Sequence, residues 1–348
     1  MTLRQDRQFD YDLRKQGNMM NTSFLTGMVS AFTVIEPASA DNFDEPGYLA
    51  ANPDVRDAIL KGHLESGLQH FNAFGQSENR KVRNTAAVSQ LRVKKLKKIE
   101  PILRKDMAFE MSGDTFNYLT DELRLLGNIA ETAAVSANSY NEDVLDIINE
   151  FRDGVVLDCG AGQRDVYYDN VVNFEIVNYD TTDVLGIGEA LPFKDDSFDA
   201  VISIAVLEHV RDPFTCAREI SRVLKPGGKL YCSVPLLQPL HGYPHHYYNM
   251  THQGLANLFQ SEVDIKKQDV IPSTGPIWSL TWILNRWLAQ LPPEAADELR
   301  KMTVGELDTN PIIFLDSPWV KELPMEAQLE LASATILHGI KKSIEPVV

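Results

Sequence analysis

Short apolar runs separated by turn-forming residues are the main pattern between residues 155 and 235. Val155–Leu157, Phe198–Ala205 and Lys229–Val234 each predict a buried strand, because they are rich in β-branched and aliphatic residues. A helix is predicted from about Pro213, with Asp212 as its N-cap. Its apolar stripe consists of Phe214, Ala217, Ile220, Val223 and Leu224, and Pro226-Gly227-Gly228 ends it. This alternation of strands and a helix predicts an α/β fold with a doubly wound sheet.

A glycine-rich loop follows the first of these strands. The strand ends in Asp158, and after one cysteine the chain reads Gly160-Ala161-Gly162. Glycines let a backbone loop approach a ligand closely, and open α/β sheets bind cofactors at the carboxyl ends of their strands. The loop is therefore a candidate cofactor site.

Four blocks in this region carry a resemblance to a known family. The chain reads VLDCGAG, then ALPFKDDSFDAVIS, LEHVRDP and EISRVLKPGG, in that order. This succession resembles the class I S-adenosylmethionine-dependent methyltransferases of type 11, over residues 142–271. The resemblance implies a Rossmann-like sheet that binds S-adenosylmethionine. A dinucleotide-binding fold is the weaker alternative, because the loop reads GAGQRD and lacks the third glycine of GxGxxG.

The resemblance also implies roles for residues around the loop. S-adenosylmethionine carries no phosphate, so the loop of Gly160, Ala161 and Gly162 would pass under its methionyl portion while Asp158 orients it. The next predicted strand, Val171–Val177, offers Glu175 as the acceptor for the ribose hydroxyls, with Asp180 as the alternative. The alternative is that both acids are solvated loop carboxylates with no role in cofactor binding. Arg164 stands where the family has a third glycine, and the short segment before Val171 predicts a short or missing crossover helix.

The adenine subsite departs from the family pattern. Ile187 occupies the position that is often acidic in the family. Gly188 and Ala190 would then supply backbone contacts, and Glu189 would substitute for the missing acid. Ala205, at the end of its strand, completes the predicted cofactor-binding set.

A loop rich in histidine and tyrosine is the candidate acceptor site. It runs from Gln238 towards a helix that Thr251 caps. A histidine base would assist methylation of a hydroxyl group, and His241, His245 and His246 are the candidate catalytic residues. Structural hydrogen bonding is the alternative role for each of them.

The N-terminal part is organised as three segments. Residues 1–40 form an extension, residues 41–82 a small helical module, and residues 83–125 a basic linker helix before a methyltransferase domain at 126–275. In the module, Asn52 is predicted to cap a helix begun by Pro53, and a second helix is predicted near residues 65–74. The module resembles one found beside bacterial glycan-building enzymes, and its histidines, His63 and His70, are expected to be surface or packing residues.

Positive charge is concentrated between Arg80 and Lys105. This stretch holds ten Lys or Arg residues and one acid, Glu100, whereas the whole chain has a net charge of −16. It is interpreted either as a solvated linker helix held against the acidic body or as a patch for an anionic lipid, glycan or membrane face.

The remaining segment, 276–348, is predicted to be a helical lid or interface. An aromatic helix begins at Pro276, and a second amphipathic helix is predicted over Met325–Ile344. A homodimer face and interfacial membrane binding are the alternatives for the aromatic helix.

Composition excludes several classes. Three cysteines without a CxxC pair predict neither a disulfide framework nor a zinc site, and no metal is expected. The acidic balance disfavours nucleic acid as substrate, and no run approaches the length that spans a bilayer. Residues 24–40 superficially resemble a signal peptide, but the preceding acidic residues favour a cytoplasmic location.

Together these features predict an S-adenosylmethionine-dependent methyltransferase. The neighbouring module favours O-methylation of a glycan or lipid-linked glycan precursor. The alternatives are a small aromatic or quinone-like acceptor, and a catalytically degenerate scaffold in polysaccharide assembly.

Overall fold

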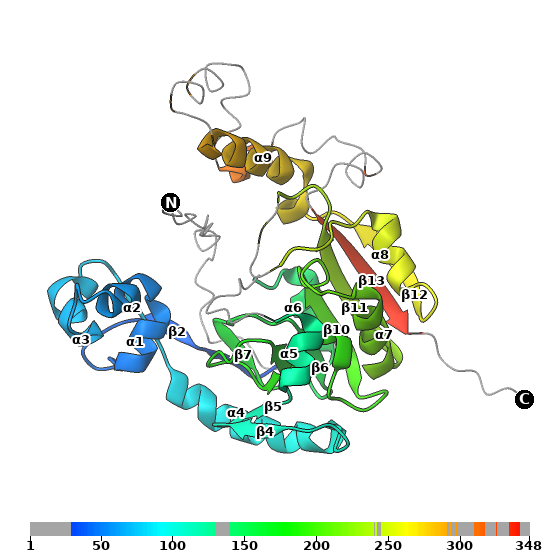
Figure 1. The fold of residues 1–348 in the computed structure, drawn as a ribbon, viewed down its shortest axis with the longest axis horizontal. Coiled ribbons are helices and arrows are strands. Elements are labelled where there is room, and N and C mark those ends of the chain that lie inside the picture. The colour runs from blue at the N-terminus through cyan, green and yellow to red at the C-terminus, as the bar shows by residue number, and fades with distance from the viewer. Residues whose placement is uncertain are drawn as a thin grey trace, which may run out of the picture.

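The computed structural model describes residues 29–129, 139–239, 241 and 245–290, and, nearer the C-terminus, 293, 297, 310–316, 325 and 334–341. Its central element is a nine-stranded sheet in the order β12-β13-β11-β10-β6-β8-β9-β5-β4 (Figure 1). These strands are β4 (Glu110–Ser112), β5 (Thr115–Asn117), β6 (Val156–Cys159), β8 (Val171–Glu175), β9 (Val184–Leu185), β10 (Phe198–Ile204), β11 (Leu224–Pro235), β12 (Val263–Asp269) and β13 (Ala334–Lys341). Two smaller sheets pair β1 (Ala31–Thr33) with β7 (Val166–Tyr168), and β2 (Ile35–Pro37) with β3 (Lys81–Arg83).

Helices pack around these sheets. They are α1 (Glu45–Ala51), α2 (Pro53–Leu60), α3 (Gly67–His70), α4 (Thr85–Ile99), α5 (Asp121–Gly127), α6 (Glu142–Glu150), α7 (Pro213–Val223), α8 (His252–Phe259) and α9 (Pro276–Gln290). Short turns of other helix types are η2 (Phe71–Gly75), η3 (Glu100–Ile102), η4 (Gly188–Ala190), η5 (Pro272–Thr274) and η7 (Pro311–Phe314).

The centre of the sheet is parallel, as the alternating pattern predicts. β6 pairs in parallel with β8 and β10, and β10 pairs in parallel with β11. Val201 lies level with Leu157 on one side and Leu230 on the other, and all three are at most 1% exposed. The Rossmann-like α/β fold is confirmed. Because parallel strands run in one direction, the loops after β6, β8 and β10 meet at one edge of the sheet.

The connection from β6 to β8 differs from the usual helical crossover. Residues 160–170 are all described and contain the strand β7 but no helix. The prediction of a short or missing crossover helix is therefore confirmed. Helix α4, from the N-terminal part, packs nearby instead: Lys95 Nζ donates to Val171 O at 2.6 Å.

The basic segment is not a solvated linker. Arg83, Arg92 and Lys95 are only 2%, 4% and 3% exposed. Arg83 Nε lies 2.6 Å from Asp180 Oδ2, and Lys95 Nζ lies 2.8 Å from Asp183 Oδ2. The segment is held against acidic residues of the sheet domain, as predicted, but the prediction that it is solvated is wrong for these three side chains, because helix periodicity alone does not reveal distant ion-pair partners. The exposed lysines of α4 (Lys94, Lys97 and Lys98) leave the anionic-partner interpretation as a prediction.

The rest of residues 83–125 belongs to the central sheet. β5 pairs in parallel with β9, and β4 pairs with β5 as the edge hairpin. The predicted boundary at residue 125 therefore divides the sheet, because strands as short as these carry little periodicity of their own.

The N-terminal module has its own small core of Tyr48, Val55, Phe71 and Val82. Both predicted helices are present, as α2 and as α3 with η2. Asn52 occupies the N-cap position of α2, but its side chain donates to the carbonyls of Tyr48 and Lys81 and caps nothing. His70 is buried against the Tyr48 hydroxyl, whereas His63 is exposed.

The second C-terminal helix is a wrong prediction in its described part. Residues 334–341 form β13, which pairs antiparallel with both β11 and β12. β13 packs closely against β12, because a Cβ added at Gly339 would lie 2.2 Å from Val263 Cγ1. Ile336 and Leu337 place buried apolar side chains on opposite faces of this strand, so its pattern resembles that of a buried helix segment. The aromatic helix is confirmed as α9.

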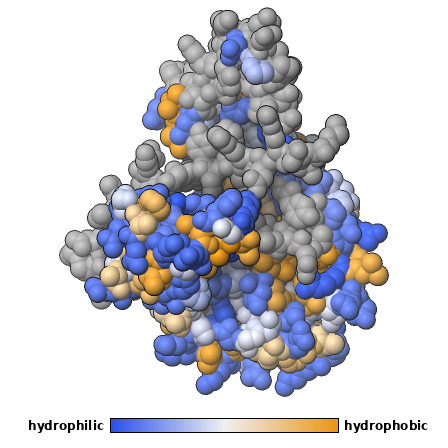
Figure 2. Space-filling model, turned by 60° about the vertical axis from the view of Figure 1, so that its left-hand side comes forward, coloured by the Kyte–Doolittle hydropathy of each residue, from blue (hydrophilic) through white to orange (hydrophobic). Residues whose placement is uncertain are grey.

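The molecular surface has a mixed apolar and hydrophilic character. On the face shown in Figure 2, apolar residues are scattered among hydrophilic ones. Within the described part of the chain, none of the helices has the length and apolarity needed to cross a bilayer. The three cysteines are free and buried, as the composition predicts.

The buried Lys95–Asp183 pair gives a stability prediction. Lys95→Met should lower the free energy of unfolding by about 3–5 kcal/mol, because it leaves a buried carboxylate without its ammonium partner. Urea denaturation followed by circular dichroism measures this change. Lys94→Met, the exposed neighbour on the same helix, should change it by less than about 0.5 kcal/mol. Equal stability of the two variants would contradict the prediction.

Candidate active site

The glycine loop lies against the carboxyl end of β8. The amides of Gly160 and Ala161 donate to Phe174 O at 2.9 and 3.0 Å. Gly160 and Gly162 have φ angles of +86° and +63°, which favour glycine. A Cβ at Gly160 would lie 2.3 Å from Val206 Cγ2, so the loop accepts no side chain there. The sequence-predicted loop is thus a tight backbone turn at the correct edge of the sheet.

Asp158 lies directly beneath this loop and is completely buried. Its Oδ2 accepts from Arg164 Nη2 at 2.5 Å and from the Tyr140 hydroxyl at 2.5 Å. The Arg164 guanidinium also lies 4.0 Å from the centre of the Tyr140 ring. Asp158 Oδ1 has no hydrogen-bond partner among the described residues. Arg164, the departure from the family pattern, is therefore a buried counter-ion of Asp158.

The two acids proposed for the ribose are in different situations. Glu175 is 3% exposed, and its Oε2 accepts from Gly162 N at 2.7 Å, so it borders the glycine loop. Burial raises the pKa of Glu175 above its ordinary value. Asp180 pairs with Arg83 and also accepts from Nε2 of Gln163, the residue after the loop, at 3.2 Å. The structure therefore places Glu175 in contact with a loop glycine, whereas Asp180 contacts only the residue that follows the loop.

The proposed adenine segment forms the 3-10 turn η4. Glu189 Oε1 accepts from the backbone amides of Arg211 and Asp212, at the start of α7. Its carboxylate thus has a structural partner, and the substitution of Glu189 for the missing acid stays a prediction. Ile187 is 1% exposed, and a Cβ at Gly188 would lie 2.5 Å from Cys216 Sγ.

Ala205 ends β10 in an unusual conformation. Its φ angle is +54°, and its amide donates to Ser233 O at 2.9 Å. This left-handed residue turns the chain sharply after the strand and leads into Val206, which covers Gly160.

The three predicted catalytic histidines have different environments. His241 Nδ1 lies 2.9 Å from Pro239 O, and its ring contacts that of Trp282 in a tilted arrangement with 5.1 Å between centroids. His245 Nε2 lies near Asn128, and His246 Nε2 lies 2.9 Å from Asn249 Oδ1. Burial lowers the pKa of His241 to about 4, which makes it a weak base at neutral pH.

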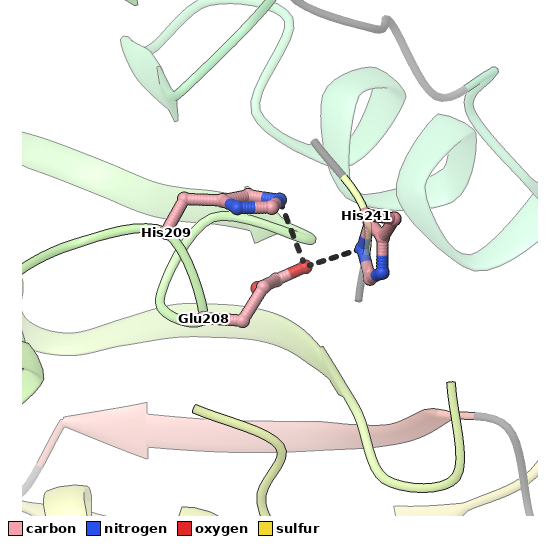
Figure 3. A group of neighbouring side chains, drawn as sticks. All are labelled: Glu208, His209 and His241. Carbon is pink, nitrogen blue, oxygen red and sulfur yellow. Dashed lines mark ion pairs between the residues drawn. The ribbon is translucent and has the colours of Figure 1, made fainter. Parts of the chain in front are cut away.

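Glu208 and His209 are site residues that the sequence prediction did not assign. Glu208 is 0% exposed, and burial raises the pKa of its carboxyl to about 8. Its Oε1 lies 3.7 Å from His209 Nε2 and 3.9 Å from His241 Nε2 (Figure 3). Burial also lowers the pKa of His209. The available signal was the position of the Glu-His pair, directly after the carboxyl end of β10.

Comparison with known proteins supports this interpretation of the loop. Residues 157–232 match the family model described as a methyltransferase domain. One relative is the ubiquinone/menaquinone biosynthesis C-methyltransferase UbiE of Pasteurella multocida, 46% identical over 67 residues, which are 18% of this chain and 24% of that protein. Another is the ubiquinone biosynthesis O-methyltransferase of Cereibacter sphaeroides, 25% identical over 135 residues, or 38% and 44% of the two chains.

One solved structure is similar over part of the chain. The [4+2]-cyclase SpnF is 16% identical, with 60% of this chain and 85% of that chain covered and a TM-score of 0.34. The chain spans less than half the length of these two sequence relatives. Residues 157–232 are thus similar to a methyltransferase domain.

The contrast between Glu175 and Asp180 gives a second prediction. Glu175→Gln should weaken S-adenosylmethionine binding about tenfold to a hundredfold, because it removes a charged acceptor at the loop. Asp180→Asn should leave this affinity unchanged and lower the melting temperature, because it weakens a buried ion pair. Calorimetric titration and thermal unfolding measure the two effects. Loss of affinity in Asp180→Asn alone would reverse the assignment.

Proposed function

We propose that this protein transfers the methyl group of S-adenosylmethionine to an oxygen atom of a hydroxylated acceptor. One observation carries the proposal: a tight glycine turn at Gly160–Gly162 lies between two buried carboxylates, Asp158 and Glu175, at the carboxyl edge of a parallel sheet. The match of residues 157–232 to a methyltransferase domain supports it.

The residues present fit this cofactor. Asp158 Oδ1 is a buried acceptor without a partner among the described residues, which suits the methionyl ammonium group. The Arg164 guanidinium beside it places a positive charge where a methionyl carboxylate would be favourable. Glu175 would accept the ribose hydroxyls. Asp158 and Glu175 are acceptors and Arg164 is a donor, and S-adenosylmethionine offers groups of both kinds.

The bound cofactor supplies an electrophilic methyl group on a positively charged sulfur. The acceptor oxygen must approach that carbon in line with the bond to sulfur, and such positioning supplies about 7–11 kcal/mol. We assign this task to the histidine loop, because His241 lies beside Glu208 at the edge of the sheet and its ring contacts Trp282. The acceptor hydroxyl would pass its proton to solvent water during the transfer.

The preferred acceptor class is a glycan or a lipid-linked glycan precursor. Support comes from the N-terminal module, whose sequence resembles a module found beside glycan-building enzymes. A small aromatic or quinone-like acceptor is the second candidate. Two observations favour it: the Trp282 ring next to His241, and the ubiquinone-related names of the two relatives.

A catalytically degenerate scaffold is the third candidate. Arg164 and Ile187, the departures from the family pattern, motivated it. Arg164 is folded away against Asp158 and Ile187 lies in the core, so neither side chain is a surface insertion. Binding of the cofactor separates this candidate from the two enzymatic ones.

Calorimetric titration with S-adenosylmethionine and S-adenosylhomocysteine tests the cofactor site. The wild type should bind near micromolar affinity, about −8 kcal/mol. Gly160→Arg should abolish binding, because its side chain meets Val206. Gly227→Ala is a matched control, since Gly227 also has a positive φ, +79°, but its Cβ would meet nothing within 4 Å. No binding by folded wild type would overturn the enzymatic proposal.

Transfer of a labelled methyl group from S-adenosylmethionine tests the acceptor. Matched sets of glycans and hydroxylated aromatic compounds should be compared at equal concentration, and the methylated atom identified by mass spectrometry. Label in the glycan set would support the preferred class. Label only in the aromatic set would replace it with the second candidate.

A further inference from the structure

Glu208, His209 and His241 bring three metal-binding atoms together at the carboxyl edge of β10 (Figure 3). Glu208 Oε1, His209 Nε2 and His241 Nε2 all lie within 4.8 Å of one another. Glu208 and His209 follow β10, whereas His241 comes from the histidine loop after β11. The cluster therefore depends on the fold and is not a local sequence motif.

The Glu208 carboxylate lacks the hydrogen bonds that burial normally demands. The residue is 0% exposed, and neither carboxylate oxygen has a hydrogen-bond donor among the described residues. A buried charge without a partner is costly, and such groups are paired or coordinate a metal. Both histidine contacts, at 3.7 and 3.9 Å, are longer than a hydrogen bond.

Both histidines direct Nε2, the nitrogen available for metal binding, towards Glu208. His209 Nδ1 lies 2.7 Å from His245 O, and His241 Nδ1 lies 2.9 Å from Pro239 O. A carbonyl oxygen only accepts, so each Nδ1 carries the proton and each neutral ring turns the lone pair of Nε2 towards Glu208. Metal-binding histidines typically have this arrangement, with the second ring nitrogen bonded to a carbonyl or carboxylate.

From these three observations we propose that Glu208, His209 and His241 bind a divalent transition-metal ion of the Zn²⁺ type. Two imidazoles and one carboxylate form a known catalytic ligand set for zinc, which leaves a position open for a further ligand. Ligands about 2.0–2.2 Å from a tetrahedral ion lie roughly 3.3–3.5 Å apart. The two spacings from Glu208 Oε1, 3.7 and 3.9 Å, contract to these values by a few tenths of an ångström, and the two histidine rings, within 4.8 Å at their ligand atoms, close around the ion. The site contains no cysteine, which explains why cysteine spacing did not predict it.

The open position suits the oxygen of a hydroxylated acceptor, an assignment that rests on the proposed function. A bound metal lowers the pKa of a coordinated hydroxyl, so the proton passes to water before or during transfer. The acceptor oxygen then forms its bond to the methyl carbon, and the sulfonium becomes a neutral thioether. The metal remains divalent throughout and no oxidant is needed.

Titration with Co²⁺ tests the site directly, because its visible absorption reports coordination independently of activity. The protein should be prepared without a histidine tag and stripped with a chelator. We expect about one equivalent of Co²⁺ to bind with visible absorption, and Zn²⁺ to displace it. Glu208→Gln, His209→Ala and His241→Ala should each weaken binding at least tenfold. His63→Ala, an exposed histidine of the N-terminal module, should bind as the wild type does.

Thermal unfolding keeps the test decisive if a variant is unstable. Zn²⁺ should raise the melting temperature of the wild type and of His63→Ala, but not that of His241→Ala. No visible absorption with stripped wild type, or unchanged Co²⁺ affinity in Glu208→Gln, would overturn the metal site. In that case Glu208 holds a proton, and Glu208→Gln should be at least as stable as the wild type. S-adenosylmethionine binding in the presence of chelator separates this failure from failure of the proposed function.

Discussion

The structure depends on compensation of buried carboxylates. Among the described residues of the sheet domain, five acids are at most 9% exposed: Asp158, Glu175, Asp183, Glu189 and Glu208. Ionised carboxylates in a low-dielectric interior require a counter-charge or several hydrogen-bond donors. Four of the five acids have such partners, and each partner fixes a different part of the fold. Glu208 has no hydrogen-bond donor among the described residues, so the same constraint that organises the fold also marks the candidate metal site.

This compensation makes the N-terminal segment part of the domain. Asp183 is neutralised by Lys95 from α4, and Asp180 by Arg83 from β3. These cations come from outside the part of the chain that matches a methyltransferase domain. Helix α4 packs beside β8, whose connection from β6 has no crossover helix of its own. The basic segment is therefore a structural replacement for that helix, joined to the sheet by charge as well as by apolar contacts.

Local patterns predicted the elements whose cause is local. β10 and α7 follow from an apolar run and from the Asp212–Pro213 start, and Asp212 does accept from Thr215 N. The prediction failed where the cause lies far along the chain. β13 is a strand because it fills the space between β11 and β12, and Arg92 is buried because Asp114 and Asp183 face it. Charge runs and short apolar runs contain no information about such distant partners.

The candidate site shows the same division. The glycine loop was predictable, because Gly160 and Gly162 are themselves the sequence signal for a tight backbone turn. The cluster of Glu208, His209 and His241 was not, because it joins residues more than 30 positions apart. Such residues are far apart in the sequence, whereas the parallel sheet brings the ends of its strands together.

One turn links the two sites. Ala205, in its left-handed conformation, directs Val206 onto Gly160, and three residues after Ala205 the chain reaches Glu208. The side chain that closes the glycine loop and the carboxylate of the metal cluster therefore lie on one short, strained connection after β10. Strain of this kind persists only where the surroundings enforce it, and it is concentrated at functional sites. A shift of Glu208 towards an ion must then be accommodated by the same turn that shapes the cofactor loop, so the two sites share their geometry.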